Sequence, residues 1–350
     1  MALPTILVTR RLPLKILNQL TMHGHVVTWE SDYPVTREWL LDHISEAEAL
    51  YCLLTDCIDR DVILLGKRLR VISSMSVGVD HIDVAECTNR GIPVGHTPGV
   101  LTETTADLAF ALLMAAARRL EEGARYVRQG QWTTWNPDLL LGRDVYGATL
   151  GIIGFGRIGQ AVARRALGFK MKVLVAQVSR SHDKEDEPTR SPEVKVADVF
   201  HQWTWSESRE SGAVQSVPLS DVLANADFLS LHVPLTKETR HMIGTNEFRI
   251  MKPTAILINT ARGGVVETEA LYRALKDGII RAAALDVTEP EPLPASHPLL
   301  SLTNCLVIPH LGSASVATRG RMALMAAENV IAGLKGNRLP YCINPQVYDA

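Results

Sequence analysis

The chain has 350 residues, a length that suits two domains of ordinary size better than a single core. With 46% hydrophobic and 21% charged residues it is expected to be globular, and its formal net charge of −2 gives no reason to expect nucleic-acid or membrane partners. Five scattered cysteines without C-x-x-C spacing indicate neither disulfides nor a zinc site, and since no apolar run nears the roughly 18 residues of a bilayer span, we expect a cytoplasmic protein without a bound metal.

The first hundred residues predict an α/β domain of their own, because short apolar runs alternate with amphipathic stretches. A long helix is then predicted from about Glu103 to Arg119. Its apolar residues lie nearly all round, so it should be buried between layers. The apolar runs lie at 6–8, 49–54 and 71–75, and the amphipathic stretches at 14–20 and 62–69.

A glycine-rich turn follows the apolar run that begins at Thr149. Glycines with G-x-G-x-x-G spacing stand at Gly154, Gly156 and Gly159, where they permit a tight turn, a close approach of backbone N–H groups to a pyrophosphate, and close helix packing. Such a turn alone is often only a turn. Here a helix over 158–167, which Gly168 should end, and a second apolar run at 172–176 complete a βαβ unit, so dinucleotide binding is predicted.

Helical patterns separate further apolar runs after this unit, which indicates a doubly wound parallel sheet. The sequence therefore predicts two doubly wound parallel-sheet (Rossmann/flavodoxin-like) α/β domains. A dinucleotide-binding domain at 105–311 is expected to be inserted in a substrate domain made of 1–104 and 312–350, to which a last helix over about 315–334 returns. The further strands are expected at 228–233, 255–259, 282–286 and 305–308.

The segment 181–215 does not fit this pattern, because it is polar, charged and punctuated by proline. We interpret it as a solvated, disordered excursion. The alternative is that Trp203 and Trp205 dock on a surface and form a partner site.

Reactive side chains follow three of the predicted strands, at the sheet edge where ligands bind in open α/β proteins. Arg262 can hold a substrate carbonyl and carboxylate by paired hydrogen bonds, and His310 can deliver the proton that a developing alkoxide needs. A glutamate bonded to that histidine fixes its tautomer and favours its protonated form. The set is sufficient for hydride transfer.

These residues and the motifs at 75–83 and 97–106 resemble the D-2-hydroxyacid dehydrogenase family, and the loops 131–137 and 293–300 are most similar to its glyoxylate/hydroxypyruvate reductases. The resemblance implies that Arg262 binds substrate, that His310 is the acid/base, and that Glu291 rather than Glu289 is its partner, since the family's glutamate falls five residues after the aspartate matched by Asp286.

Further roles follow from the same resemblance. Asp286 should lie by the nicotinamide, and the backbone of Val77 and Gly78 should grip the substrate carboxylate. Trp135 should reach the substrate pocket of the partner subunit in a homodimer. The implied substrate-binding residues are Leu54, Met75, Val77, Gly78, Trp135, Arg262 and His310. The implied cofactor-binding residues are Gly154, Phe155, Gly156, Arg157, Ile158, Gly159, Ser179, Arg180, Pro234, Thr239, Thr260, Ala261, Asp286 and Gly312.

Charge near the second strand of the βαβ unit favours NADPH. An NAD enzyme places an acidic residue there for the ribose 2′-hydroxyl, whereas this chain has Ser179 and Arg180, which suit a 2′-phosphate. Asp183 is the acidic residue that would restore NADH binding if the loop folds back.

The function implied is NADPH-dependent reduction of glyoxylate to glycolate and of hydroxypyruvate to D-glycerate. Within the family, a 2-ketogluconate-type reductase or a glycerate dehydrogenase is the alternative. A dinucleotide-sensing co-repressor-like binding module is the alternative of a different class, because such modules can keep the same residues.

Overall fold

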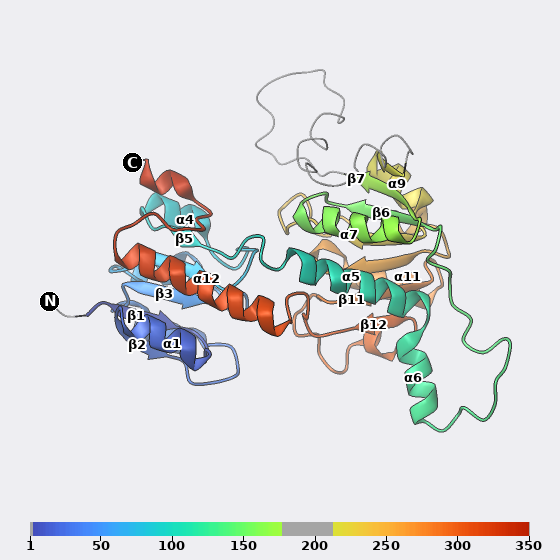
Figure 1. Cartoon of the computed structure of the whole chain (residues 1–350), viewed down its shortest axis with the longest axis horizontal. Helices are drawn as coiled ribbons and strands as arrows, with labels where there is room; N and C mark the ends of the chain where they lie inside the picture. Colours follow the sequence, from blue (N-terminus) through green and yellow to red (C-terminus); the bar gives the residue numbers. More distant parts are fainter. Residues whose placement is uncertain (1–2, 177–212, 350) are drawn as a thin grey trace, which may run out of the picture. The chain divides into compact units, whose positions relative to one another are not determined.

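The computed structural model describes residues 3–176 and 213–349 (Figure 1). The chain divides into two compact units, the first made of Met1–Leu101 and Ala314–Ala350, the second of Thr102–Ser313. Each unit is built on a parallel sheet with helices on both faces. The predicted fold class, two parallel-sheet α/β domains, is confirmed.

The sheet of the first unit has, among the residues described, five parallel strands in the order β2-β1-β3-β4-β5. Alternate side chains face opposite ways: Ile6 and Val8 pack with α1 and α12, whereas Leu7 packs with α2 and α3. The strands are β1 (Thr5–Val8), β2 (His25–Thr28), β3 (Ala49–Cys52), β4 (Val71–Ser74) and β5 (Val94–Gly95). The helices are α1 (Leu14–Thr21), α2 (Arg37–Ile44), α3 (Arg60–Leu65), α4 (Val84–Asn89) and α12 (Val316–Leu334).

The sheet of the second unit is also parallel, in the order β12-β11-β10-β9-β6-β7-β8 within the described part of the chain. The chain enters at β6, runs outward through β7 and β8, and returns to β9 beside β6 before it continues the other way. Ligands bind outside the carboxyl ends of the strands at such a reversal of strand order. The strands are β6 (Thr149–Ile153), β7 (Lys172–Ala176), β8 (Val214–Ser216), β9 (Phe228–Leu231), β10 (Ile256–Asn259), β11 (Ala282–Leu285) and β12 (Cys305–Val307).

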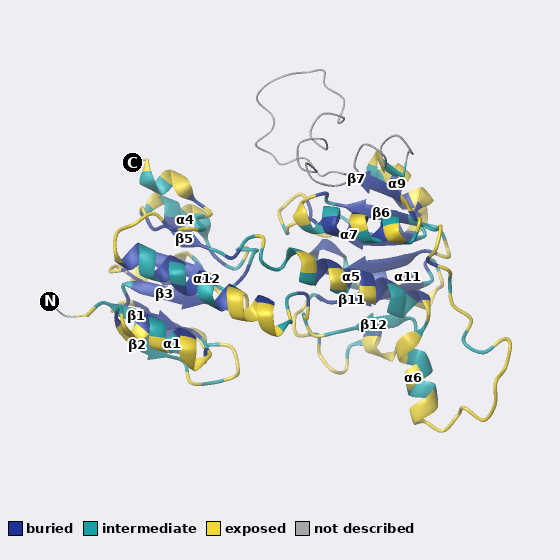
Figure 2. Cartoon of the chain, viewed as in Figure 1, coloured by how far each residue is buried: buried dark blue, intermediate teal, exposed yellow. Residues whose placement is uncertain are grey.

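Helices cover both faces of this sheet. Figure 2 shows its central strands as buried, whereas the edge strands β12 and β8 are more exposed. Ile152 and Val175 pack with α5 and α7, whereas Ile153 and Leu174 pack with the helices of the opposite face. The prediction of a helix buried between layers holds for one side of α5 only: Ala106, Ala109 and Leu113 lie in this core, but Glu103 and Asp107 are exposed. The helices are α5 (Thr102–Ala117), α7 (Arg157–Gly168), α9 (Leu219–Asn225), α10 (Thr245–Ile250) and α11 (Thr268–Lys276).

Three details of local structure differ from what the sequence predicts. The helix expected from Glu103 to Arg119 ends at Ala117, and a separate α6 (Leu120–Arg128) begins after Arg119, whose φ of 54° breaks the helix. Helix α7 ends at Gly168, as expected, but Lys170 (φ 52°) rather than this glycine takes the left-handed position of the C-terminal motif.

The third concerns the segment 181–215, for which the sequence predicts a solvated, disordered excursion. Its end, from Val214, belongs to β8, whose residues pair with β7. Ser179, Arg180, Trp203 and Trp205 lie outside the residues that the structure describes.

None of the helices in the described ranges combines the length and the apolar character needed to cross a lipid bilayer.

Candidate active site

The glycine-rich turn between β6 and α7 contains two glycines at which any side chain would be strained. Gly154 has a φ of 92°, and a Cβ atom there would lie 2.7 Å from the carbonyl carbon of His232. A Cβ atom on Gly159 would collide with the carbonyl oxygen of Gly154. The turn and the close packing of α7 therefore depend on glycine for different reasons, one conformational and one steric.

Gly156 differs from both, because a Cβ atom on it would meet nothing within 4 Å and its φ of −74° is ordinary. The first hydrogen bond of α7 joins the N–H of Gln160 to the carbonyl of Gly156 at 3.0 Å. The N–H groups of Arg157, Ile158 and Gly159 therefore precede the helical bonding pattern, as donors for an anion do. Open space in front of a helix N-terminus fits a dinucleotide pyrophosphate.

The turn after β10 is held by Asn259, a buried side chain that the sequence analysis assigned no role. Its Oδ1 accepts a hydrogen bond from the N–H of Ala261 at 3.0 Å, and its Nδ2 donates to the carbonyl of Arg262 at 2.9 Å. The signal in the sequence is an amide residue at the end of an otherwise apolar strand. Asn259 thereby fixes the backbone from which Arg262 projects.

Thr260, in the same turn, is 8% exposed, and its hydroxyl has no hydrogen-bond partner within the described part of the chain. A buried hydroxyl without a partner is uncommon in native structures, and ordered water or a bound ligand can supply the missing hydrogen bond. This fits the prediction that Thr260 and Ala261 contact a cofactor.

His310 and Glu291 form a hydrogen-bonded pair in which Nδ1 of the imidazole and Oε1 of the carboxylate are 2.6 Å apart. The second oxygen of Glu291 accepts from the N–H of Thr288 at 3.2 Å. Burial alone would raise the pKa of Glu291, but the bond to His310 and the charges of His310 and Arg262 lower it. The carboxylate is therefore ionised. The structure brings His310 and Glu291 together, and Arg262 lies in the same unit, in the turn after β10.

The backbone of His310 is left-handed, with a φ of 52°, and Asp286 holds it there. The N–H of His310 donates to the carbonyl of Asp286, and the buried carboxylate of Asp286 accepts from the N–H groups of Leu311 at 2.5 Å and Gly312 at 2.8 Å. Burial raises the pKa of Asp286, while those hydrogen bonds and His310 oppose that rise. Asp286 thus maintains a strained turn at the histidine.

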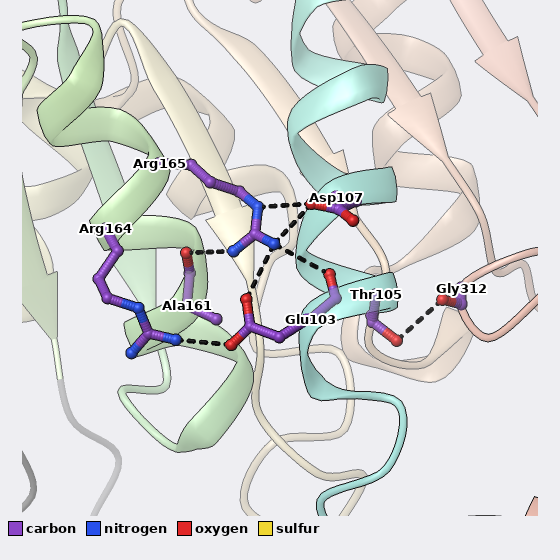
Figure 3. A network of polar contacts seen from close by, with 7 residues as sticks. All are labelled: Glu103, Thr105, Asp107, Ala161, Arg164, Arg165 and Gly312. Atoms are coloured by element: carbon purple, nitrogen blue, oxygen red, sulfur yellow. Dashed lines mark hydrogen bonds and ion pairs between the residues drawn. The ribbon is translucent and has the colours of Figure 1, made fainter. Parts of the chain in front are cut away.

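Helix α5 supports both this turn and α7 (Figure 3). The Thr105 hydroxyl donates to the carbonyl of Gly312 at 3.0 Å. On the same helix, Glu103 and Asp107 accept hydrogen bonds from Arg165 of α7 at 2.9 Å and 2.8 Å. One helix therefore braces the His310 turn and the helix behind the glycine-rich turn.

Other residues expected to bind the cofactor have structural partners of their own. The hydroxyl of Thr239 donates to the carbonyl of Pro234 at 2.6 Å and accepts from the N–H of Thr236 at 2.8 Å, so it holds the loop after β9. Phe155 is buried at the glycine-rich turn, and its carbonyl accepts from the side chain of Gln160 at 3.0 Å.

The residues expected to contact substrate through backbone or apolar side chains belong to different units. Leu54, Met75, Val77 and Gly78 lie in the first unit, in the loops that follow β3 and β4. Ser76 holds its loop through a hydrogen bond of 2.7 Å to the carbonyl of Gly78. Trp135 lies in the second unit and is 78% exposed in the single chain.

Known proteins are similar to this chain over nearly its whole length. The family model for the NAD-binding domain of D-isomer specific 2-hydroxyacid dehydrogenases matches residues 110–205 and 191–312. A glyoxylate reductase from Korarchaeum cryptofilum is 48% identical over 345 residues, which are 98% of this chain and 97% of that protein. The chain belongs to the D-isomer specific 2-hydroxyacid dehydrogenase family. It is therefore an oxidoreductase of 2-oxo and 2-hydroxy acids, and its second unit is the family's nucleotide-binding domain.

Solved structures of the family are similar over nearly the whole chain. The crystal structure of the TT0316 protein from Thermus thermophilus has a TM-score of 0.83 and 44% identity, with 97% of this chain and 99% of that chain covered. An NADPH-dependent glyoxylate/hydroxypyruvate reductase from Sinorhizobium meliloti, in complex with NADP and malonate, has a TM-score of 0.80 and 28% identity, with 98% of both chains covered.

Proposed function

We propose that the chain is an NADPH-dependent reductase of small 2-oxo acids, which converts glyoxylate to glycolate and hydroxypyruvate to D-glycerate. The observation that carries this proposal is the 2.6 Å pair of His310 and Glu291, on the same unit as the open glycine-rich turn. The names of the relatives from Korarchaeum and Sinorhizobium support the choice of substrates.

Each catalytic side chain has one role in this proposal. Bound NADPH supplies the hydride that the carbonyl carbon of the substrate accepts. The planar guanidinium of Arg262 pairs with the substrate carbonyl and carboxylate and orients them. His310 donates a proton to the oxygen that becomes the alcohol, and Glu291 holds Nδ1 and stabilises the charged imidazole.

The nucleotide is held by the N–H groups at the start of α7 and by the hydroxyl of Thr260. The preference for NADPH rests on the sequence at Ser179 and Arg180, where a cation stands in place of an acidic residue. The Sinorhizobium relative, described as NADPH-dependent, supports the same choice. NADH is the alternative coenzyme.

We further propose that two copies of the chain form a dimer through the loop that carries Trp135. Trp132 and Trp135 are 62% and 78% exposed in the single chain. Exposed tryptophans of this kind are anchors that a partner's surface covers.

A steady-state comparison tests the function. The purified protein is assayed with NADPH and with NADH against glyoxylate, hydroxypyruvate, pyruvate and 2-ketogluconate. The highest kcat/KM is expected for NADPH with glyoxylate or hydroxypyruvate. Faster turnover of 2-ketogluconate would identify the other reductase type, and nucleotide binding without turnover of any of these acids would favour a sensing module.

A further inference from the structure

A second glutamate of the loop 288–291 has partners quite different from those of Glu291. One carboxylate oxygen of Glu289 accepts from Nη2 of Arg240 at 2.5 Å, and the other lies 2.7 Å from Nε2 of His241. The Glu289 side chain is only 31% exposed, whereas Arg240 is 52% exposed. Glu289 and Glu291 are exposed to a similar extent, but Glu289 contacts Arg240 and His241, whereas Glu291, two residues later, contacts His310.

The charge of Glu289 is maintained by these contacts. Burial alone would raise its pKa, but the hydrogen bonds from His241 and Arg240, with the charges of both, lower it below the usual value. Because Arg240 and Glu289 are 52% and 31% exposed, their ion pair contributes only about 0–1 kcal/mol to stability, and its main effect is to fix where the carboxylate lies.

The two partners of Glu289 come from the loop after β9, which is itself fixed to the turn of Arg262. The N–H of His241, a residue with a φ of 52°, donates to the carbonyl of Gly264 at 2.8 Å. The strands β9, β10 and β11 are neighbours in the sheet. The carboxylate thus links the loops after β11 and β9, and the N–H of His241 joins the loop after β9 to the turn after β10.

Backbone contacts complete the anchoring of the loop. The hydroxyl of Thr268, the first residue of α11, donates to the carbonyl of Glu289 at 2.7 Å. A Cβ atom on Gly263 would collide with the carbonyl of Thr288, so the turn of Arg262 and the loop of Glu291 are in direct backbone contact. Any movement of the loop would change the distance between Arg262 and Glu291.

We propose that Glu289 is a positioning residue that holds the loop 288–291 against the Arg262 turn, so that Glu291 meets His310 at the geometry proton transfer requires. This inference rests on the proposed roles of Arg262, Glu291 and His310. Glu289 does not take part in the reaction. It acts through Glu291, whose orientation depends on the loop 288–291. Arg240 and His241 hold this loop by their hydrogen bonds to Glu289.

The test is a set of variants assayed with glyoxylate and NADPH. Glu289→Gln removes the charge but keeps the shape, and kcat/KM for glyoxylate is expected to fall about ten- to a hundredfold, the scale of a small misplacement of catalytic groups. The dissociation constant of NADPH should stay within about twofold, and the matched control Glu269→Gln, which breaks an exposed ion pair with Arg273 on α11, should leave kinetics unchanged.

The decisive variant combines Glu289→Gln with Glu291→Gln. If Glu289 acts through Glu291, the double variant is no slower than Glu291→Gln alone. The inference would be overturned if adding Glu289→Gln to Glu291→Gln lowered kcat/KM by the same factor as Glu289→Gln does alone. It would also be overturned if Glu289→Gln had normal kinetics while Glu291→Gln was impaired. Normal kinetics of Glu291→Gln would instead contradict the proposed function.

Thermal unfolding separates positioning from misfolding. The unfolding midpoint of Glu289→Gln is expected near that of the Glu269→Gln control. If Glu289→Gln does not fold, Thr268→Val loosens the same loop without a change of charge, and unaltered kcat/KM in that variant would count against the proposal.

Discussion

Nδ1 of His310 and Oε1 of Glu291 lie 2.6 Å apart, and the histidine backbone is held in a left-handed conformation by Asp286. The bond at Nδ1 orients the ring so that Nε2 is the nitrogen opposite the carboxylate. This arrangement places the His310 imidazole at a fixed position as the proton donor, so removal of the imidazole should lower the rate of reduction.

His310→Ala is expected to lower kcat by ~10²- to 10⁴-fold, because a positioned proton donor contributes about that factor. Binding of NADPH, measured by fluorescence titration, should survive. The exposed His25→Ala in the first unit is the control and should be fully active. Near-normal turnover of His310→Ala would remove this residue from the mechanism.

Arg262→Lys is expected to lose kcat/KM for glyoxylate and to keep its affinity for NADPH. A lysine ammonium cannot reproduce the paired hydrogen bonds of a planar guanidinium. Arg249→Lys, at an exposed position on α10, provides the comparison. A loss confined to NADPH affinity would contradict the assignment of Arg262 to the substrate.

Gly156→Ala and Gly159→Ala should affect different properties, the first the affinity for NADPH and the second the stability of the fold. Gly156→Ala has room for its methyl group and is expected to fold with a normal unfolding midpoint, but the methyl occupies the space in front of α7, so NADPH binding weakens. Gly159→Ala collides with the carbonyl of Gly154 and should destabilise the fold by about 1–3 kcal/mol or more. Calorimetry of both variants measures the unfolding midpoint, and titration measures the dissociation constant of NADPH. Tight binding by Gly156→Ala would place the pyrophosphate elsewhere.

Arg180→Ala should weaken NADPH binding by about 1.5–3 kcal/mol and leave NADH binding nearly unchanged, since a charge-assisted hydrogen bond to the 2′-phosphate is lost. Titration of both coenzymes measures the difference. A wild-type protein that already prefers NADH would show that the inference from charge was wrong.

Trp135→Ala is expected to raise KM for glyoxylate or to relax selectivity toward bulkier 2-oxo acids, with NADPH binding largely unaffected. The reason is that the indole is proposed to close the small pocket of a second copy. Trp132→Ala, in the same loop, should have the smaller effect. Sedimentation that shows an active monomer would contradict both the dimer and the role of Trp135.

The parts of the fold that the sequence could predict are those with local signals. Apolar runs locate the strands, and the glycines at 154 and 159 are required by conformation and packing that any such turn imposes. The break at Arg119 and the strand β8 have no such signal. An arginine with positive φ and a short strand after a polar segment depend on contacts that only the folded chain provides.

The candidate site also has parts that the sequence predicts and parts that only the structure reveals. Glu289 and Glu291 are two residues apart in one polar loop, and local physics cannot tell which faces His310, so the sequence needed the family's spacing to choose Glu291. The partners of Glu289 and the amide bonds of Asn259 come from neighbouring loops. These contacts were found only in the structure.

The hydrogen bond from Thr105 to Gly312 joins the two ends of the second unit. Thr102 and Ser313 are its boundaries, so this bond fastens its first and last turns to each other. A domain whose ends meet can be cut out of its host as one piece, or rejoined with a short linker in a different order, without interrupting a strand of either sheet. We expect residues 102–313 to fold and bind nucleotide as a separate polypeptide.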